Sequence, residues 1–217
     1  MLKKVTKYFF QKIIIAYHNF FSPKFRVLRR HSDYESYLKK QKEKTLDQKR
    51  IAKWFGAEWN TKLEGFRVLF ERNSEIIKEA KKCICLGART GQEVAALHEL
   101  GKDAIGIDLV EFPPLTIEGD IHNLSYKDSS FDFVFTNIFD HSLYPDKFVI
   151  EMERVCKSGG FILINIQLFN SGDDYSENII NDAKELINLF ESSKLVYSRS
   201  INNTFDGMNW EVAMSKL

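Results

Sequence analysis

The stretch Cys-Ile-Cys-Leu-Gly-Ala-Arg-Thr-Gly at residues 83–91 combines a short apolar run with a turn bounded by two glycines. The apolar run predicts a buried strand, and the segment from Gly91 to Leu100 predicts a helix that Gly101 closes. A turn this tight favours residues without a Cβ atom. It presents backbone N–H groups and a helix N-terminus, which favour anionic groups of a ligand. Taken alone the turn is a weak indicator, because many strand-to-helix turns contain two glycines.

The chain beyond this turn alternates between strand-like and helix-like segments. Further strands are expected at 104–107, 116–118, 131–136, 161–166, 195–201 and 210–214, and further helices at 145–156 and 176–192. This alternation predicts an α/β fold. We expect a Rossmann-like, mostly parallel seven-stranded sheet with an antiparallel C-terminal strand and helices on both faces. In such sheets ligands bind outside the carboxyl ends of the strands.

Two aspartates follow neighbouring strands of the expected sheet. Asp108 ends the second strand, 17 residues after Gly91, and Asp120 follows the third. An acid at the end of the second strand accepts hydrogen bonds from ribose hydroxyls in nucleotide-binding units. The alternative is a helix cap or a solvated turn. Three strand ends with suitable groups favour a nucleotide-like ligand.

Five segments in fixed order carry a resemblance to a known family. They are CLGARTG at 85–91, GIDL at 106–109, GDI at 119–121, SFDFVFTN at 130–137 and ERVCKSGG at 153–160. This series resembles class I S-adenosylmethionine-dependent methyltransferases, and it is most similar to the methyltransferase type 11 group. The similarity covers about residues 80–217. It implies S-adenosyl-L-methionine as the cofactor and methyl transfer to a small-molecule or lipid-like acceptor.

The resemblance assigns roles on the methionine and ribose side of the cofactor. Gly87, Ala88 and Gly91 are expected to line the methionine part. Asp108 is expected to bind the ribose diol, with Leu109 beside the adenine.

On the adenine side, Asp120 is expected to hold the amino group, with Ile121 near the ring. Asn137 is expected to face the methionine part or the acceptor. Two positions depart from the family pattern. Cys85 stands where an acid is frequent, and Arg89 replaces the middle glycine. Arg89 pairs either with the cofactor carboxylate or with a neighbouring acid, and the sequence leaves both open.

The connection between Asp108 and Thr116 holds only about seven residues and includes Pro113-Pro114. This is too short for the usual crossover helix. The third strand is therefore expected to follow the second without a helix between them.

Methyl transfer needs a positioned nucleophile more than it needs a base, since the cofactor carries the reactive group. If a base is used, His141 with Asp140 is the candidate pair, because their loop follows the fourth strand. In the alternative interpretation Asp140 caps the next helix and His141 only packs.

Other function classes remain open. The domain could bind S-adenosylmethionine without catalysis, as a regulatory or scaffold module. An NAD site is disfavoured because Gly-x-Gly-x-x-Gly is absent. Nucleic acid is an unlikely partner, since residues 54–217 carry a net charge of −10 and no Asn-Pro-Pro-Tyr-like sequence follows the fourth strand.

The N-terminal part differs in charge from the rest of the chain. Residues 1–53 contain fifteen Lys/Arg and four Asp/Glu, a net charge of +11. We expect a basic amphipathic arm at 1–32, a helical cap at 33–81 and the cofactor-binding domain at 82–217. The arm lies on an anionic membrane surface through residues 1–30, acts as a targeting segment, or covers its own domain.

Within the cap region, Thr45-x-x-Gln48 and Thr61-x-x-Glu64 resemble capping boxes, and Gly56 is expected to end the first of these helices. The three cysteines form no disulfide framework, which favours a reducing, cytoplasmic location with peripheral membrane contact as an option. Cys83 and Cys85 share a strand face without a second ligand pair, so no metal site is expected.

Overall fold

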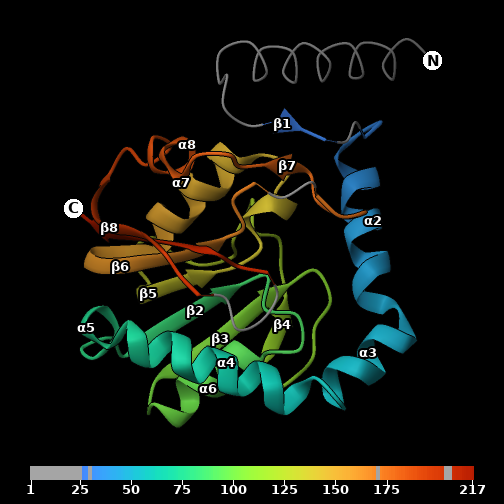
Figure 1. Ribbon diagram of the computed structural model, residues 1–217, viewed down its shortest axis with the longest axis horizontal. Helices are drawn as coiled ribbons and strands as arrows, with labels where there is room; N and C mark the ends of the chain where they lie inside the picture. The colour runs from blue at the N-terminus through green and yellow to red at the C-terminus, as the bar shows by residue number, and fades with distance from the viewer. Residues whose placement is uncertain (1–25, 29–30, 170–171, 203–206) are drawn as a thin grey trace.

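The computed structural model describes residues 26–28, 31–169, 172–202 and 207–217. Its centre is a seven-stranded sheet with the order β4-β3-β2-β5-β6-β9-β8 (Figure 1). The strands are β2 (Lys82–Leu86), β3 (Asp103–Asp108), β4 (Thr116–Glu118), β5 (Phe131–Thr136), β6 (Cys156–Ile166), β8 (Ser193–Ser200) and β9 (Trp210–Lys216). β9 runs antiparallel to both its neighbours, and the pairs among β2 to β6 are parallel. The predicted fold class is confirmed.

Strand β2 decides where a ligand binds. It lies between β3 and β5. The strands β3 and β4 follow on one side of β2, and β5 and β6 follow on the other, so the strand order reverses at β2. The carboxyl end of β2 is therefore the topological switch point at which open α/β sheets bind ligands.

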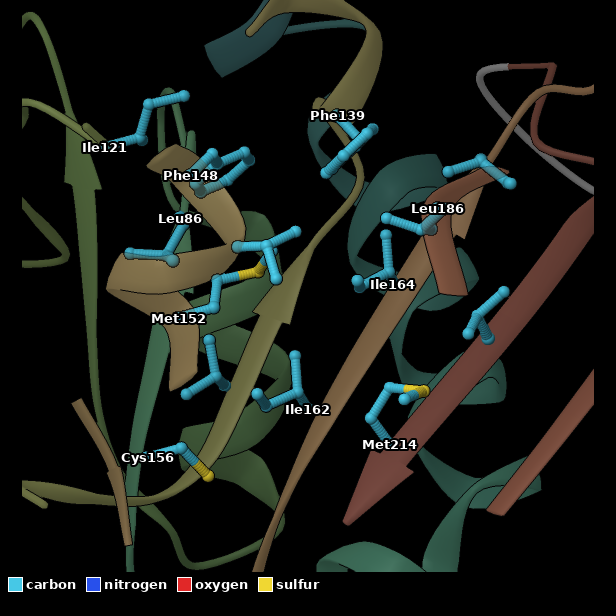
Figure 2. Packing of buried hydrophobic residues seen from close by; sticks show 14 of the residues in the cluster. Leu86, Ile121, Phe139, Phe148, Met152, Cys156, Ile162, Ile164, Leu186 and Met214 are labelled. Carbon is cyan, nitrogen blue, oxygen red and sulfur yellow. The ribbon is translucent and has the colours of Figure 1, made fainter. Parts of the chain in front are cut away.

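Helices cover both faces of the sheet (Figure 1). Along β2 the side chains alternate, since successive residues of a strand point to opposite faces. Cys83 and Cys85 pack with α4 (Trp59–Arg72) and α6 (Gln92–Glu99). On the other face, Leu86 joins the cluster of α7 (Pro145–Val155), whose Phe148 and Met152 are shown in Figure 2. α8 (Ala183–Ile187) adds Leu186 to that cluster.

The three cysteines are free and buried. Burial raises the pKa of the Cys83 thiol to about 12, so it behaves as an apolar core group.

The expected helices between 33 and 81 are present as α2 (Tyr34–Leu46), α3 (Gln48–Phe55), α4 and α5 (Ser74–Ile77). Gly56 ends α3 as predicted. Both predicted capping boxes are wrong. Thr45 lies inside α2, and Asp33 and Asp47 supply the side-chain caps that start α2 and α3. Thr61 lies inside α4, which begins at Trp59 without a side-chain cap. Asp33 accepts from the backbone N–H of Ser36 at 2.9 Å.

The predicted helix at 176–192 is also wrong. Only Ala183–Ile187 is helical, and Asn178–Ile179 forms β7, which pairs with β1 (Arg26–Val27). The buried Asn178 amide donates to the carbonyls of Phe139 and Ser142, which holds this segment extended. Tertiary hydrogen bonds therefore override the amphipathic pattern.

The strand predicted at 161–166 begins five residues earlier, directly after α7. Gly159 and Gly160, which precede the predicted strand, lie within β6. A Cβ atom on Gly160 would lie 2.8 Å from the carbonyl oxygen of Asp132, so the close strand approach explains the glycine.

Most of the predicted basic arm lies outside the described residues, so its amphipathic helix is not assessed. Within the described ranges, no helix is long and apolar enough to cross a membrane.

Candidate active site

The turn between β2 and α6 requires glycine at two positions. Gly87 and Gly91 have φ angles of +78° and +86°. A Cβ atom on Gly87 would lie 2.1 Å from Cγ1 of Ile138, and one on Gly91 would lie 2.5 Å from Cβ of Leu115. Gly87 therefore lets the Ile138 side chain pack directly against the turn, and Gly91 does the same for Leu115.

A cavity lies at the carboxyl ends of β2 and β3. We call it the first cavity. It is lined by Tyr37, Gln41, Lys44, Thr45, Gly87, Arg89, Asp108, Leu109, Asp120, Ile121, Ile138 and His141. Six residues predicted to bind cofactor are thus brought together around one space: Gly87, Arg89, Asp108, Leu109, Asp120 and Ile121. Ala88 and Gly91 stand behind this lining, in the packed turn.

Asp108 is fixed by the glycine turn. Its Oδ2 accepts the backbone N–H of Arg89 at 2.9 Å, and Arg89 itself has a φ of +49°. Burial raises the pKa of the Asp108 carboxyl, and the Arg89 N–H acts against this by stabilising the charged form. The carboxylate is thereby aimed from the end of β3 at the cavity it lines.

Asp120 is held by groups from two elements. The Tyr34 hydroxyl of α2 donates to Oδ2 at 2.7 Å, and the His122 N–H donates to Oδ1 at 2.8 Å. Burial alone would raise its pKa, but the hydrogen bonds from His122 and Tyr34 outweigh burial and hold the pKa of Asp120 at about 2. Asp120 is therefore ionised at neutral pH.

The His122 ring extends this network inward. The backbone N–H of Tyr144 donates to Nε2 of His122, so Nε2 is the acceptor and Nδ1 carries the proton. The Ser142 hydroxyl, 2.8 Å from Nε2, then donates to it. The order Ser142, His122, Asp120 resembles a hydrolase triad, but Ser142 is fully buried, so the chain of bonds orients Asp120.

We expect Tyr34→Phe to destabilise the protein by about 0.5–1.5 kcal/mol at neutral pH, the usual net value of one hydrogen bond. The folded pKa of Asp120 lies below the ordinary value of 3.8, so its stabilisation is complete above about pH 4 and is lost as pH falls through about 2. In the variant the pKa of Asp120 rises, and less stability is lost in that acid range.

Urea unfolding at several pH values measures this effect. Tyr126→Phe is the control, since that ring packs on Phe131 at the amino end of β5. Equal acid dependence in Tyr34→Phe and wild type would contradict the role of Tyr34.

A second cavity adjoins the first. Lys44, Arg89, Ile138 and His141 line both. The second cavity also contains the predicted residues Asn137 and Asp140. Its wall is polar and rich in cations: Lys44, Arg50, Lys53, Lys62 and Arg89.

The Arg89 guanidinium lies 4.6 Å from the ring centroid of Trp54 in α3, a cation–π contact. Arg89 thereby ties the glycine turn to the N-terminal helices. Its pairing with the cofactor carboxylate stays a prediction.

His141 lies in the 3₁₀ turn η1 (Phe139–His141) after β5. Its Nδ1 is 2.9 Å from the carbonyl oxygen of Tyr175, and its Nε2 is 3.1 Å from Nζ of Lys44. Asp140 is more distant, with Oδ1 4.0 Å from Nε2 of His141. Lys44 is thus the nearer partner of the predicted base.

Helix α2 contributes to the first cavity four residues that were not predicted from the sequence. The residues concerned are Tyr37, Gln41, Lys44 and Thr45. Their spacing matches one helix face, but most of them are polar, and a search for apolar periodicity passes over such a stripe.

The site fits a nucleoside-bearing cofactor. The glycine turn borders the first cavity at Gly87, and two carboxylates, Asp108 and Asp120, line the same cavity from the ends of successive strands. A Rossmann-like sheet with such a site defines a methyltransferase-type fold. Residues 84–164 match the family model described as a methyltransferase domain. The match and the fold confirm the resemblance to class I S-adenosylmethionine-dependent methyltransferases, and with it S-adenosylmethionine as the cofactor of this class.

Solved structures share the fold at low sequence identity. The 1,6-didemethyltoxoflavin-N1-methyltransferase of Burkholderia thailandensis, bound to 1,6-didemethyltoxoflavin and S-adenosylhomocysteine, has a TM-score of 0.63 at 12% identity, over 88% of this chain and 94% of that one. An S-adenosylmethionine-dependent methyltransferase of Methanosarcina mazei has a TM-score of 0.56 at 17% identity, over 67% and 97% of the two chains. A protein of Pyrococcus horikoshii OT3 has a TM-score of 0.57 at 16% identity, over 74% and 92%. No curated protein matches this chain in sequence.

Proposed function

We propose that this protein transfers a methyl group from S-adenosylmethionine to a small polar acceptor. The observation that carries this proposal is the pair of adjoining cavities. The first gathers the cofactor-type residues at the switch point, and the second opens from it through four shared residues. A methyl donor in the first cavity and a methyl acceptor in the second can thus meet at these shared residues.

In this proposal the first cavity holds the cofactor. Asp108 accepts from the ribose diol, and the ionised Asp120 accepts from the adenine amino group. Leu109 and Ile121 flank the adenine, while Gly87 lines the methionine part. Ala88 and Gly91 shape that turn from behind.

S-adenosylmethionine supplies a methyl group activated on a sulfonium sulfur. The chain's own residues bind, orient and shield it. α2 lines the first cavity, and its Tyr37 hydroxyl donates to the carbonyl oxygen of His141 at 3.0 Å, which fastens the helix to η1. Such a cover excludes water from the reacting groups.

The second cavity is the proposed acceptor site, with Asn137, Asp140 and His141 in its wall. Its polar, cation-rich lining favours a polar acceptor over a lipid-like one. The Burkholderia thailandensis enzyme, which holds a small heterocycle together with S-adenosylhomocysteine, offers a parallel for two ligands on this fold.

Asp108→Asn tests the cofactor site. Asparagine keeps an oxygen for the Arg89 N–H but loses the charge that binds hydroxyls. We expect S-adenosylhomocysteine, measured by calorimetry, to bind the wild type and to bind the variant about 10–100-fold more weakly, since hydrogen bonds to charged groups contribute about 1.5–3 kcal/mol.

Asp103→Asn is the matched control, an exposed aspartate at the other end of the same strand. It should bind like wild type. Absence of binding by the wild-type protein would reject the proposed function. Equal affinity of Asp108→Asn and wild type would remove Asp108 from the site.

A further inference from the structure

We propose that Lys44 is the proton-accepting residue of the transfer reaction, held in place by His141. The proposal rests on the proposed function and deepens it. A methyl group that leaves the first cavity for the second must pass the residues common to both linings. These are Lys44, Arg89, Ile138 and His141.

Only two of the four side chains can take a proton. The guanidinium of an arginine such as Arg89 is not deprotonated in proteins, and the Ile138 side chain has no basic atom. Lys44 and His141 remain, and their nitrogens Nζ and Nε2 lie 3.1 Å apart.

The hydrogen bonds of His141 decide between them. The carbonyl oxygen of Tyr175 accepts only, so the Nδ1 of His141 that faces it at 2.9 Å carries the ring proton. Nε2 of the neutral ring is then the acceptor and receives an N–H from Lys44. The lone pair of His141 is therefore engaged, whereas an uncharged Lys44 amine keeps its own lone pair available. His141 acts as a positioning residue.

The surroundings of Lys44 favour the uncharged amine. The residue is only 8% exposed. Burial, assisted by Arg89 from the glycine turn and Arg50 from α3, lowers the pKa of Lys44 to about 8, while Asp173 and Asp140 act in the opposite direction.

Two further groups face the amine. The Tyr175 ring centroid lies 5.0 Å from Nζ, and the His141 ring accepts from it. Both stabilise the ammonium once it has formed. The amine is thus near balance between its two states, as a proton acceptor at neutral pH must be.

The step balances in atoms and charge. The acceptor X–H bond and the donor S–C bond break, and X–CH₃ and Lys44 N–H bonds form. The S–C electron pair stays on sulfur, and the X–H pair completes the new bond to carbon. The positive charge of the sulfonium is replaced by that of the Lys44 ammonium, which Asp140 and Asp173 favour.

A group with this role must lie near the sulfonium and be neutral before transfer. Both conditions are measurable by binding alone, without an acceptor. S-adenosylmethionine carries the sulfonium charge and S-adenosylhomocysteine does not. By linkage, a cation near the sulfonium binding position weakens S-adenosylmethionine specifically while Lys44 is protonated.

The experiment is calorimetry of both compounds from pH 6.5 to 9.5 with wild type, Lys44→Met and Lys39→Met. Lys39 is an exposed lysine on the same helix. In wild type and Lys39→Met, the affinity ratio of S-adenosylmethionine to S-adenosylhomocysteine should rise about fivefold to tenfold as pH passes about 8. In Lys44→Met the ratio should stay flat.

The outcomes separate the two proposals. Binding of both compounds with the same pH dependence in wild type and Lys44→Met overturns the role of Lys44 and leaves the proposed function standing. Binding of neither compound to the wild type overturns both.

Variants of His141 test its positioning role. In His141→Leu the ammonium loses an acceptor, so the rise in the ratio should move to lower pH, whereas His141→Gln, which keeps an acceptor oxygen, should stay close to wild type. A flat ratio in His141→Leu would assign the titration to His141 and reject Lys44.

Discussion

Gly87→Ala is expected to weaken binding of S-adenosylhomocysteine by at least about 100-fold, or about 2.7 kcal/mol. The added Cβ atom would lie 2.1 Å from Cγ1 and 2.7 Å from Cδ1 of Ile138. No ordinary contact is that short, so Ile138 has to move, and Ile138 lines the first cavity. The left-handed φ of +78° adds about 1–2 kcal/mol of backbone strain.

The control variant Gly101→Ala separates the effect of the clash with Ile138 from the effect of backbone strain. Gly101 has a φ of +73°, but a Cβ atom there meets nothing within 4 Å. The control should lose a similar amount of stability from strain and keep its affinity. Calorimetry gives the affinity, and thermal unfolding gives the stability. If both variants bind alike, the turn does not border the cofactor.

Phe70→Ala is expected to lower the free energy of unfolding by about 3–5 kcal/mol. Phe70 is fully buried between α4 and the sheet. Its ring meets those of Phe133 and Phe135 edge-on, at centroid distances of 6.2 and 5.2 Å. Removing it leaves a cavity between two rigid surfaces and deletes these contacts together with the stacking on Phe66.

Val68→Ala is the matched control on the same helix. Val68 is 41% exposed, so its loss should cost well under 1 kcal/mol. Urea unfolding measures both. A loss for Phe70→Ala no greater than that for Val68→Ala would contradict the assignment of α4 to the core of this face.

The strands could be predicted from the sequence because a short run of apolar residues is a local pattern. Apolar runs such as 83–86 and 131–136 form buried strands at the expected positions. The short connection before Thr116 was correctly read as lacking a helix, and β4 still pairs with β3. The helix expected at 176–192 failed because Asn178 bonds to carbonyls from η1 and the residue after it, contacts that no local pattern reveals.

The residues of the first cavity also divide into those that a local signal predicts and those that only tertiary contacts bring to the site. Gly87, Asp108 and Asp120 were predicted because strand ends fix their places, and the parallel sheet gathers strand ends at one edge. The identity of the group that holds Asp120 was not predictable. Tyr34 lies 86 residues away in sequence and reaches Asp120 only because α2 packs across that edge.

What the sequence by itself determined is the sheet, the glycine turn and the carboxylates at its edge. Each depends on neighbours in the chain: an apolar run, a residue without a Cβ atom, an acid at a strand end. Only the tertiary structure decided that a polar stripe of α2 covers this edge and places Lys44 between two cavities. The reason is physical: how a helix docks depends on side chains from several distant segments at once, and a polar face that docks on a site leaves no apolar period in the sequence.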